Sequence, residues 1–147
     1  MAVSRQAQAT WSGDLLSGSG QVTYVTSGSI TRLPVSWASR TGSPEGQTSP
    51  EELVAAAHAA CFSMAFSNGL AKNGTPPNRL DVTAVVSFDK LDAGWRLTNS
   101  DLTVRGDVPG IDADRFQALA EEARDGCPVS QALKGNVELS VDATLES

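Results

Sequence analysis

An alanine-rich segment from Ser49 to Lys72 constrains the fold of this chain more than any other feature. Ser49 is a good helix N-cap, Pro50 suits the first helical position, and Glu52 stands at the capping-box spacing from Ser49. After Glu52 no charged residue follows until Lys72. A helix of roughly twenty residues that is apolar nearly all round has to be buried on every side. A chain of 147 residues has little to wrap such a helix, so we expect a second subunit to supply part of the cover.

The rest of the chain combines strand-like alternation with two further helix starts. Asp112 caps a helix that Gly126 is placed to end, and Cys127 with Pro128 opens a short third one. The predicted strands are residues 3–11 and 21–26, a short run marked by Val35 and Trp37, a hairpin of 80–88 with 95–107, and residues 137–145. This order of segments predicts an α+β fold, with helices packed on antiparallel sheet, in one domain that covers residues 1–147.

Composition and charge exclude several classes of function. The chain is 40% hydrophobic and 19% charged, as globular proteins are, and its net charge is −6 with no run of Lys or Arg. This charge disfavours binding to nucleic acids or anionic membranes, which needs a clustered positive field. No apolar stretch reaches the ~18 residues of a membrane helix, and residues 1–11 lack the apolar core of a signal peptide. We therefore expect a cytoplasmic protein.

The two cysteines, Cys61 and Cys127, are the first candidates for chemistry. A reducing cytoplasm disfavours a structural disulfide, and the absence of CxxC or HxxxH spacing disfavours a metal site. Cys61 lies midway along the apolar helix, where it could equally be inert packing. Cys127 precedes Pro128, at the start of a helix, where the helix dipole and free N–H groups lower a thiol pKa; an indifferent cap is the alternative.

Three other polar residues could assist a thiol. His58 precedes Cys61 by one helical turn and could form a Cys–His pair, but we favour a core histidine satisfied by a backbone carbonyl. Arg40 could stabilise a thiolate and Glu51 could orient its guanidinium, although spacing alone favours a solvated arginine and a glutamate that serves the helix dipole. Glu51 and Cys61 are ten residues apart, ~15 Å on a straight helix, so a shared site needs a bend or a second chain.

Two motifs carry a resemblance to a known family. They are Ser-Pro-Glu-Glu-Leu-Val-Ala-Ala-Ala-His-Ala-Ala-Cys-Phe-Ser-Met-Ala at 49–65 and Asp-Gly-Cys-Pro-Val-Ser-Gln-Ala-Leu-Lys at 125–134. Together with the segments 90–94 and 108–113, they resemble the osmotically inducible protein C / organic hydroperoxide resistance (OsmC/Ohr) family over nearly the whole chain. His58 and Val129 are typical of the OsmC branch, since the Ohr branch usually has Tyr at both positions. Ser49 stands where Asn is common, and both residues cap helices.

The resemblance implies a fold, an assembly and a set of site residues. The fold is an intertwined homodimer, with antiparallel sheets wrapped around long buried central helices and two sites at the subunit interface. The implied activity is a thiol-dependent peroxidase acting on organic hydroperoxides. Cys61 matches the family's peroxidatic cysteine, Cys127 its resolving cysteine, Glu51 the glutamate of the Pro-Glu motif, and Arg40 the arginine that precedes the central helix.

The resemblance also implies the course of the reaction. A Cys61 thiolate, held by Arg40, attacks the peroxide and becomes a sulfenic acid, Cys127 condenses with it, and an external dithiol of the lipoyl or thioredoxin-like type restores both thiols. No cofactor or metal is needed. The apolar side chains around Cys61, namely Phe62, Met64 and Phe66, could favour alkyl hydroperoxides over hydrogen peroxide, or could be core packing.

Three other functions stay open at this level. One is a dimer of the same fold that binds a hydrophobic ligand without turnover. Another is a redox sensor that signals through a partner, although no recognition surface is visible in the sequence. The last is a cysteine hydrolase that uses Cys61 and His58, whose activity would survive Cys127→Ser.

Overall fold

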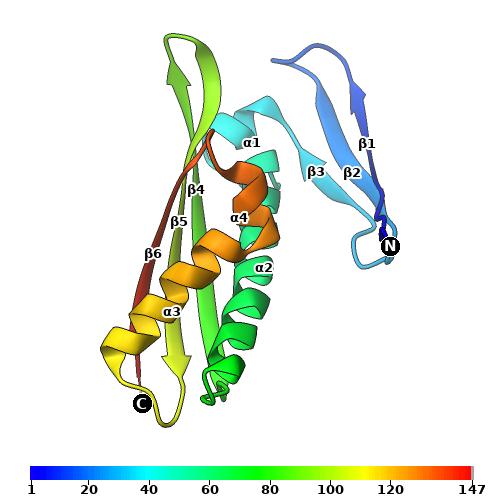
Figure 1. Ribbon diagram of the computed structural model, residues 1–147. Helices are drawn as coiled ribbons and strands as arrows, with labels where there is room; N and C mark the ends of the chain where they lie inside the picture. Colours follow the sequence, from blue (N-terminus) through cyan, green and yellow to red (C-terminus); the bar gives the residue numbers. More distant parts are fainter. Residues whose placement is uncertain (147) are drawn as a thin grey trace. The chain divides into compact units, whose positions relative to one another are not determined.

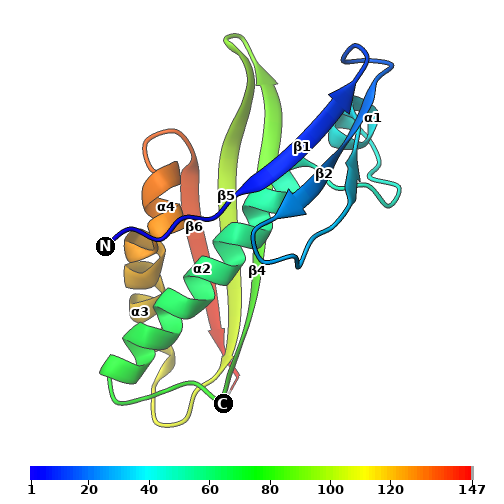
Figure 2. The same cartoon turned by 90° about the vertical axis from the view of Figure 1, so that its right-hand side faces the viewer.

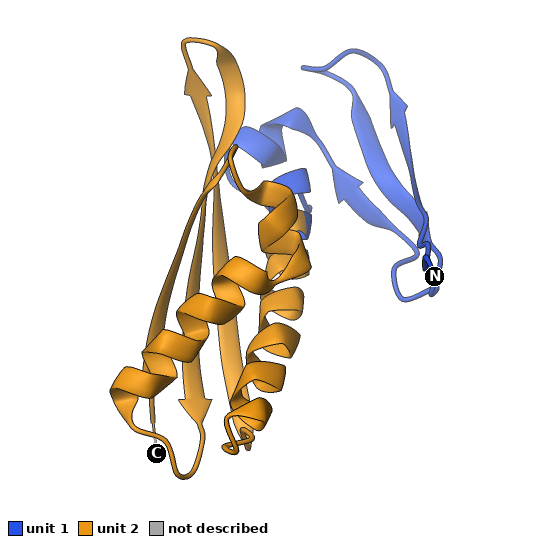
Figure 3. Ribbon diagram, in the orientation of Figure 1, with its two compact units in different colours: residues 1–53 blue, residues 54–147 orange. Residues whose placement is uncertain are grey.

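The computed structural model describes residues 1–146 and contains ten helices and strands (Figure 1). Two compact units divide the chain, an N-terminal unit of Met1–Leu53 and a C-terminal unit of Val54–Ser147 (Figure 3). The prediction of one domain over 1–147 stays a prediction. In chain order the elements are β1 (Ala7–Ser12), β2 (Ser19–Val25), β3 (Leu33–Val35), α1 (Trp37–Thr41), α2 (Pro50–Lys72), β4 (Arg79–Leu91), β5 (Gly94–Asp107), α3 (Ala113–Gly126), α4 (Pro128–Leu133) and β6 (Glu138–Leu145).

The N-terminal unit is an antiparallel meander followed by a short helix. Its sheet has the order β1-β2-β3, as the Gly and Ser turns predicted. The prediction that the third strand reaches Trp37 was wrong, because β3 ends at Val35 and Trp37 is the first residue of α1. Ser36 caps this helix by accepting from the backbone N–H of Ser39 at 3.1 Å, and the Ser39 hydroxyl accepts from the backbone N–H of Ser36 at 3.1 Å. This capping box ends the strand and starts the helix.

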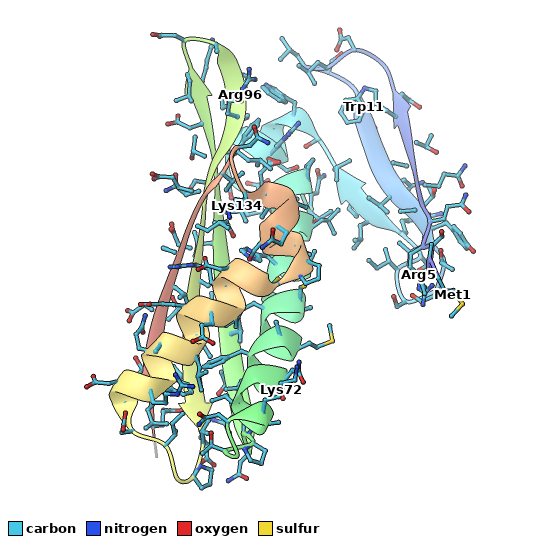
Figure 4. The ribbon with its side chains drawn as sticks, viewed as in Figure 1. Met1, Arg5, Trp11, Lys72, Arg96 and Lys134 are labelled. Atoms are coloured by element: carbon cyan, nitrogen blue, oxygen red, sulfur yellow. The ribbon has the colours of Figure 1, made fainter. Side chains whose placement is uncertain are left out.

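Helix α2 begins where the sequence predicts. The Ser49 hydroxyl accepts from the backbone N–H of Glu52 at 3.1 Å, while the Glu52 carboxylate accepts from the Thr48 hydroxyl at 2.9 Å. The helix then runs unbroken for 23 residues to Lys72, which Figure 4 shows at its far end. Two flanking hydroxyls therefore fix the N-terminal turn that carries both glutamates.

The prediction that no apolar segment is long enough for a membrane helix is wrong for α2. Over its most apolar 18 residues the mean hydropathy is 1.3, so α2 passes a length and composition test for a membrane-spanning helix. The central helix of a soluble protein passes the same test when other chains or elements cover it. Within the single chain, 22% of this window is buried.

One stripe of α2 is buried and another is bare. His58, Phe62, Phe66 and Leu70 recur every four residues, and each is fully buried. A second stripe, with Ala57, Ala60 and Met64, is exposed, and Met64 exposes 68% of its surface. Burial on every side is thus not achieved within one chain.

The C-terminal unit pairs its three strands in the order β4-β5-β6. The expected hairpin is confirmed, since β4 and β5 are antiparallel with Val82 opposite Val104. The expectation of a purely antiparallel sheet is wrong for the last strand, because β6 lies parallel to β5 with Leu102 opposite Val141. The physical reason is the connection: α3 and α4 form the crossover that a parallel pair requires. The α+β class is confirmed.

Helices α2 and α3 cover one face of this sheet, as the two views of Figures 1 and 2 show. Aromatic rings hold the layers together. The ring centroids of Phe62 and Phe66 are 5.5 Å apart, and those of Phe66 and Phe116 are 5.0 Å apart. Gly106 on β5 makes room for the Phe116 ring, since a Cβ there would lie 2.5 Å from it. This core places the second half of α2 against β5 and the first turn of α3.

Candidate active site

Arg40 and Glu51 form an ion pair inside the N-terminal unit. Arg40 is in the last turn of α1 and Glu51 is in the first turn of α2. The Nε of Arg40 donates to the two Glu51 carboxylate oxygens at 2.8 and 3.2 Å. The Glu51 side chain is only 8% exposed and that of Arg40 is 31% exposed. Spacing alone favoured a solvated arginine and a glutamate that serves the helix dipole; Glu51 does lie in the first turn of α2, but the arginine is paired with it and not simply solvated.

An apolar pocket adjoins this ion pair. It has a volume of about 340 Å³ and is lined by Trp11, Leu15, Val35, Ser36, Trp37, Arg40 and Pro50. The Arg40 guanidinium lies 5.8 Å from the centroid of the Trp37 ring, within the range of a cation–π contact. The N-terminal unit thus presents one fixed positive charge at the wall of an otherwise apolar hollow.

Cys127 links two helices of the C-terminal unit. It is the C-cap of α3, where its N–H donates to the Ala123 carbonyl at 2.9 Å, and also the N-cap of α4. The predicted position at a helix start is confirmed. Its side chain is fully buried, whereas Cys61 on α2 is partly exposed, and both are free thiols. Cys61 is therefore the sulfur that a solute can reach.

The two sulfurs contact each other and differ in acidity. Burial raises the pKa of Cys61, and the hydrogen bond with Cys127 raises it further. Burial also acts to raise the pKa of Cys127, but hydrogen bonds from Cys61, from the backbone and hydroxyl of Ser130 and from the backbone of Val129 outweigh it, so the pKa of Cys127 is lowered. Within one chain Cys127 is therefore the more acidic thiol, and a positive charge beside Cys61 would favour its thiolate.

His58 is buried and fully satisfied. Its Nδ1 lies 2.6 Å from the Ser100 hydroxyl and its Nε2 lies 2.7 Å from the Ser130 hydroxyl. The expectation of a buried histidine is confirmed, but the expected carbonyl partner was wrong, because two serine hydroxyls take its place. Burial lowers the pKa of His58, so the ring is neutral near pH 7. Since both ring nitrogens are engaged by serines, a Cys61–His58 pair is not formed in the C-terminal unit.

The aromatic residues beside Cys61 belong to the core. Phe62 and Phe66 have no exposed surface, so the alternative of core packing is confirmed for both. Glu51 and Cys61 lie on the same unbroken helix α2, and ten residues of α-helix rise by ~15 Å. Because α2 is continuous between Glu51 and Cys61, these two side chains do not meet within one chain along the helix.

Comparison with known proteins identifies the family. Residues 42–142 match the family described as OsmC-like protein, which is more than half of the chain.

The chain belongs to the OsmC-like protein family.

Curated relatives of this OsmC-like protein cover two thirds of it or more. It is 44% identical over 147 residues to Peroxiredoxin OsmC of Escherichia coli (strain K12), with all of both chains covered. It is 36% identical over 100 residues to the organic hydroperoxide resistance protein OhrA of Bacillus subtilis (strain 168), which covers 67% of this chain and 68% of that protein. The family resemblance of the two cysteine motifs is thereby confirmed.

Solved structures of the family share the fold of this OsmC-like protein. A structure of an organic hydroperoxide resistance protein from Elizabethkingia anophelis superposes with a TM-score of 0.75 at 25% identity, covering 99% of this chain and 100% of that one. OhrB of Bacillus subtilis superposes with a TM-score of 0.73 at 25% identity, covering 95% of this chain and 98% of that one.

In residues 1–146 of the OsmC-like chain, no cluster of three His, Cys, Asp or Glu side chains could hold a metal ion.

Two residues of the site were missed from the sequence. Ser130 stands in the Cys-Pro-Val-Ser motif, and nothing in that motif indicates its contact with His58. Ser100 occupies an inward position of β5, in the same alternation as Leu102 and Val104. A polar residue at a buried strand position needs a hydrogen-bond partner. The alternation therefore predicts a buried polar contact for Ser100, but it does not identify His58 as the partner.

Proposed function

We propose that this protein is a thiol-dependent peroxidase that reduces organic hydroperoxides to alcohols, with Cys61 as the peroxidatic cysteine and Cys127 as the resolving cysteine. The observation that carries the proposal is the contact between a partly exposed Cys61 and a fully buried, more acidic Cys127 at a helix start. The names of the curated relatives, a peroxiredoxin and an organic hydroperoxide resistance protein, support the same reaction.

The reaction proceeds in three balanced steps. The Cys61 thiolate attacks the distal peroxide oxygen, the O–O bond breaks, and the alkoxide leaves as the alcohol after taking a proton. The Cys127 thiolate then attacks the Cys61 sulfenic acid, an S–S bond forms, and hydroxide leaves and becomes water with a proton. An external dithiol restores both thiols by two exchanges and is itself oxidised to a disulfide. All groups that react come from the chain, the peroxide and the dithiol.

The positive charge that Cys61 needs is assigned to Arg40 of the partner subunit in a homodimer. Within a chain, α2 separates Glu51 from Cys61 by ~15 Å, so the ion pair at its N-terminus does not reach Cys61 along the helix. The exposed apolar stripe of α2, with Ala57, Ala60 and Met64, supports a homodimer in which two copies share a site. In the proposed site Glu51 orients the Arg40 guanidinium, and the positive charge of this guanidinium stabilises the thiolate and polarises the peroxide oxygen.

The apolar pocket beside Arg40 is the proposed site for the organic group of the substrate. Its walls are aromatic and aliphatic, and its volume of about 340 Å³ is sufficient for a small aryl or alkyl group. Hydrogen peroxide has no group to fill it. We therefore expect cumene hydroperoxide to be turned over with higher kcat/KM than hydrogen peroxide, and equal efficiency would contradict this assignment.

The same pocket also favours the second candidate, a non-catalytic protein that binds a hydrophobic ligand. The two functions differ in what happens to the thiols when a hydroperoxide is present. The reductant, of the lipoyl or thioredoxin-like type, and the cytoplasmic location both stay predictions.

Free-thiol titration tests the proposal. Wild type and Cys127→Ser are titrated before and after one equivalent of cumene hydroperoxide. A peroxidase loses both thiols in wild type, regains them with a dithiol, and accumulates a trappable Cys61 sulfenic acid in Cys127→Ser. If both thiols of the folded protein stay inert, the peroxidase is refuted and the ligand-binding protein takes its place.

A further inference from the structure

Strand β6 is an edge strand of the C-terminal sheet (Figure 1). The backbone N–H of Glu146, directly after the strand, donates to the Gly106 carbonyl of β5 at 2.8 Å. Because the backbone groups of successive strand residues point to alternate sides, the even-numbered residues of β6 face β5. The outer edge is formed by the N–H and C=O groups of Leu139, Val141, Ala143 and Leu145. Such an edge is a template on which another chain can add a strand.

The sequence of β6 carries few of the features that keep an edge strand from pairing. Over Glu138–Leu145 it has no Pro, Gly or Lys, and its register with β5 runs without a shift. The other edge strand, β4, carries Arg79 and Lys90 and has a register shift against β5. Protection of the β6 edge therefore has to come from another element.

Gln117 of α3 occupies the middle of this edge. Its Oε1 accepts from the backbone N–H of Ala143 at 2.9 Å, and its Nε2 donates to the carbonyl of Val141 at 3.3 Å. These partners fix the orientation of the amide, because the reversed amide would oppose two donors at Ala143 and two acceptors at Val141. Nε2 also donates to the Glu121 carboxylate at 3.0 Å, one helical turn further along α3. The carboxamide thus pairs with β6 as a peptide group of a neighbouring strand does.

A second copy of β6 fits this edge. Two β6 strands can pair antiparallel about a twofold axis, in the register that places Val141 opposite its own copy. In this register Asp142 faces Ser140. Glu138 faces Thr144, so no two carboxylates are opposed. The strand is therefore complementary to itself in shape and in charge.

We propose that Gln117 is an autoinhibitory contact that closes the outer edge of β6 to a second copy of this chain. The pairing of two β6 strands uses the C=O of Val141 and the N–H of Ala143, and the Gln117 amide holds both groups. This device is independent of the thiol chemistry. A β6 contact in addition to the dimer contact through α2 would join dimers into larger assemblies, and the closed edge stops assembly at the dimer.

The solution mass tests the closed edge. Gln117→Ala opens it, and Glu121→Ala is the matched control, because it changes α3 one turn later and leaves the Gln117 amide on β6. As the concentration rises from micromolar to millimolar, we expect sedimentation velocity to show Gln117→Ala at twice the wild-type mass and above. Wild type and Glu121→Ala keep their mass. An unchanged mass of folded Gln117→Ala overturns the proposal.

Thr144→Asp decides whether this association runs through β6. Thr144 is exposed and lies opposite Arg105 of β5, so an aspartate there has a favourable neighbour within the chain. In the paired strands it faces Glu138 of the second copy, and like charges directly opposite destabilise a ladder. We expect Gln117→Ala/Thr144→Asp to return to the wild-type mass. If the double variant stays associated, the contact lies elsewhere and the proposal is overturned.

Hydrogen exchange of the Ala143 amide tests the contact in the unassociated protein. At micromolar concentration we expect this amide to exchange about tenfold faster in Gln117→Ala than in wild type, because one hydrogen bond is lost. At millimolar concentration it is protected again, since the added strand replaces Gln117. Equal exchange in both proteins at micromolar concentration overturns the proposal. If circular dichroism shows that Gln117→Ala is unfolded, Gln117→Met, which keeps the side-chain length without the amide, is measured in its place.

Discussion

The two compact units of this protein differ in what they bury. Every buried hydrophobic residue among residues 1–146 lies between Phe62 and Val137, in the C-terminal unit. The N-terminal unit buries only two residues, Thr48 and Glu51, and both are polar. Several of its large apolar side chains, including Trp11, Leu16 and Tyr24, are exposed. A three-stranded sheet without a buried apolar face is marginal by itself, which agrees with the homodimer that we propose.

The same division separates the reacting groups. The C-terminal unit holds both thiols beside a close-packed core, and the N-terminal unit holds the Arg40–Glu51 pair beside an apolar pocket. Rigid packing suits the sulfurs, since disulfide formation needs a fixed geometry. In the proposed reaction the two units therefore contribute different groups, and variants in each unit test that contrast.

The largest effect is expected from Cys61→Ser in the C-terminal unit. Removing the nucleophile reduces hydroperoxide consumption by several orders of magnitude, to the rate without enzyme. The dithiol-coupled assay with cumene hydroperoxide measures it. Cys127→Ser is the matched control, because it leaves one turnover per chain. Full activity in Cys61→Ser would place the chemistry elsewhere.

Phe66→Ala tests the core that only the C-terminal unit has. Phe66 is fully buried between two other rings, so its truncation is expected to lower the free energy of unfolding by about 3–5 kcal/mol. Tyr24→Ala in the N-terminal unit, where the ring is 46% exposed, is expected to cost much less. Urea unfolding measures both. Equal costs would show that the N-terminal unit has a packed face of its own.

Arg40→Met tests the charge supplied by the N-terminal unit. Loss of a hydrogen-bonded charge from the thiolate is expected to lower kcat/KM about ten- to a hundredfold and to raise the apparent pKa of the peroxide reaction. Arg5→Met is the control, an exposed arginine of the same unit, labelled in Figure 4. An unchanged pH profile in Arg40→Met would refute its assignment to Cys61.

Met64→Glu tests the bare stripe of α2. A carboxylate in an apolar interface is costly, so we expect the solution mass to fall twofold, from dimer to monomer, with loss of peroxidase activity. Light scattering on a sizing column measures the mass. Glu122→Lys, on the exposed surface of α3, is expected to leave the dimer intact. A wild type that is monomeric at micromolar concentration would contradict the proposed assembly.

The smallest effect is the pH dependence due to His58, the only histidine. Burial lowers its pKa in the folded state, so the unfolded state, with a pKa near 6.5, binds the proton first as pH falls. Stability therefore decreases below about pH 6.5, by up to about 1.4 kcal/mol per pH unit. We expect His58→Gln to flatten this part of the stability profile. A slope that persists unchanged in the variant would show that carboxylates cause it.

Local signals predicted much of the fold. The hydroxyl cap of Ser49, the cap at Asp112, the hairpin of β4 and β5 and the position of Cys127 at a helix start all depend on residues a few positions apart. Helix α1 was missed because its capping box has Ser39 in place of the usual Glu or Gln, and because a single turn next to a strand gives little periodicity. The parallel pairing of β6 could not be predicted, since alternation carries no direction.

By itself the sequence determined the long apolar helix, the two cysteines, their family and the thiol chemistry that the family implies, because these features depend on residue types at fixed short spacings. Tertiary structure decided which groups meet. Arg40 pairs with Glu51 across eleven residues and a loop, and His58 meets Ser100 and Ser130 from distant elements. Such contacts depend on how elements pack in three dimensions, and packing places side chains within hydrogen-bonding distance irrespective of their separation along the chain.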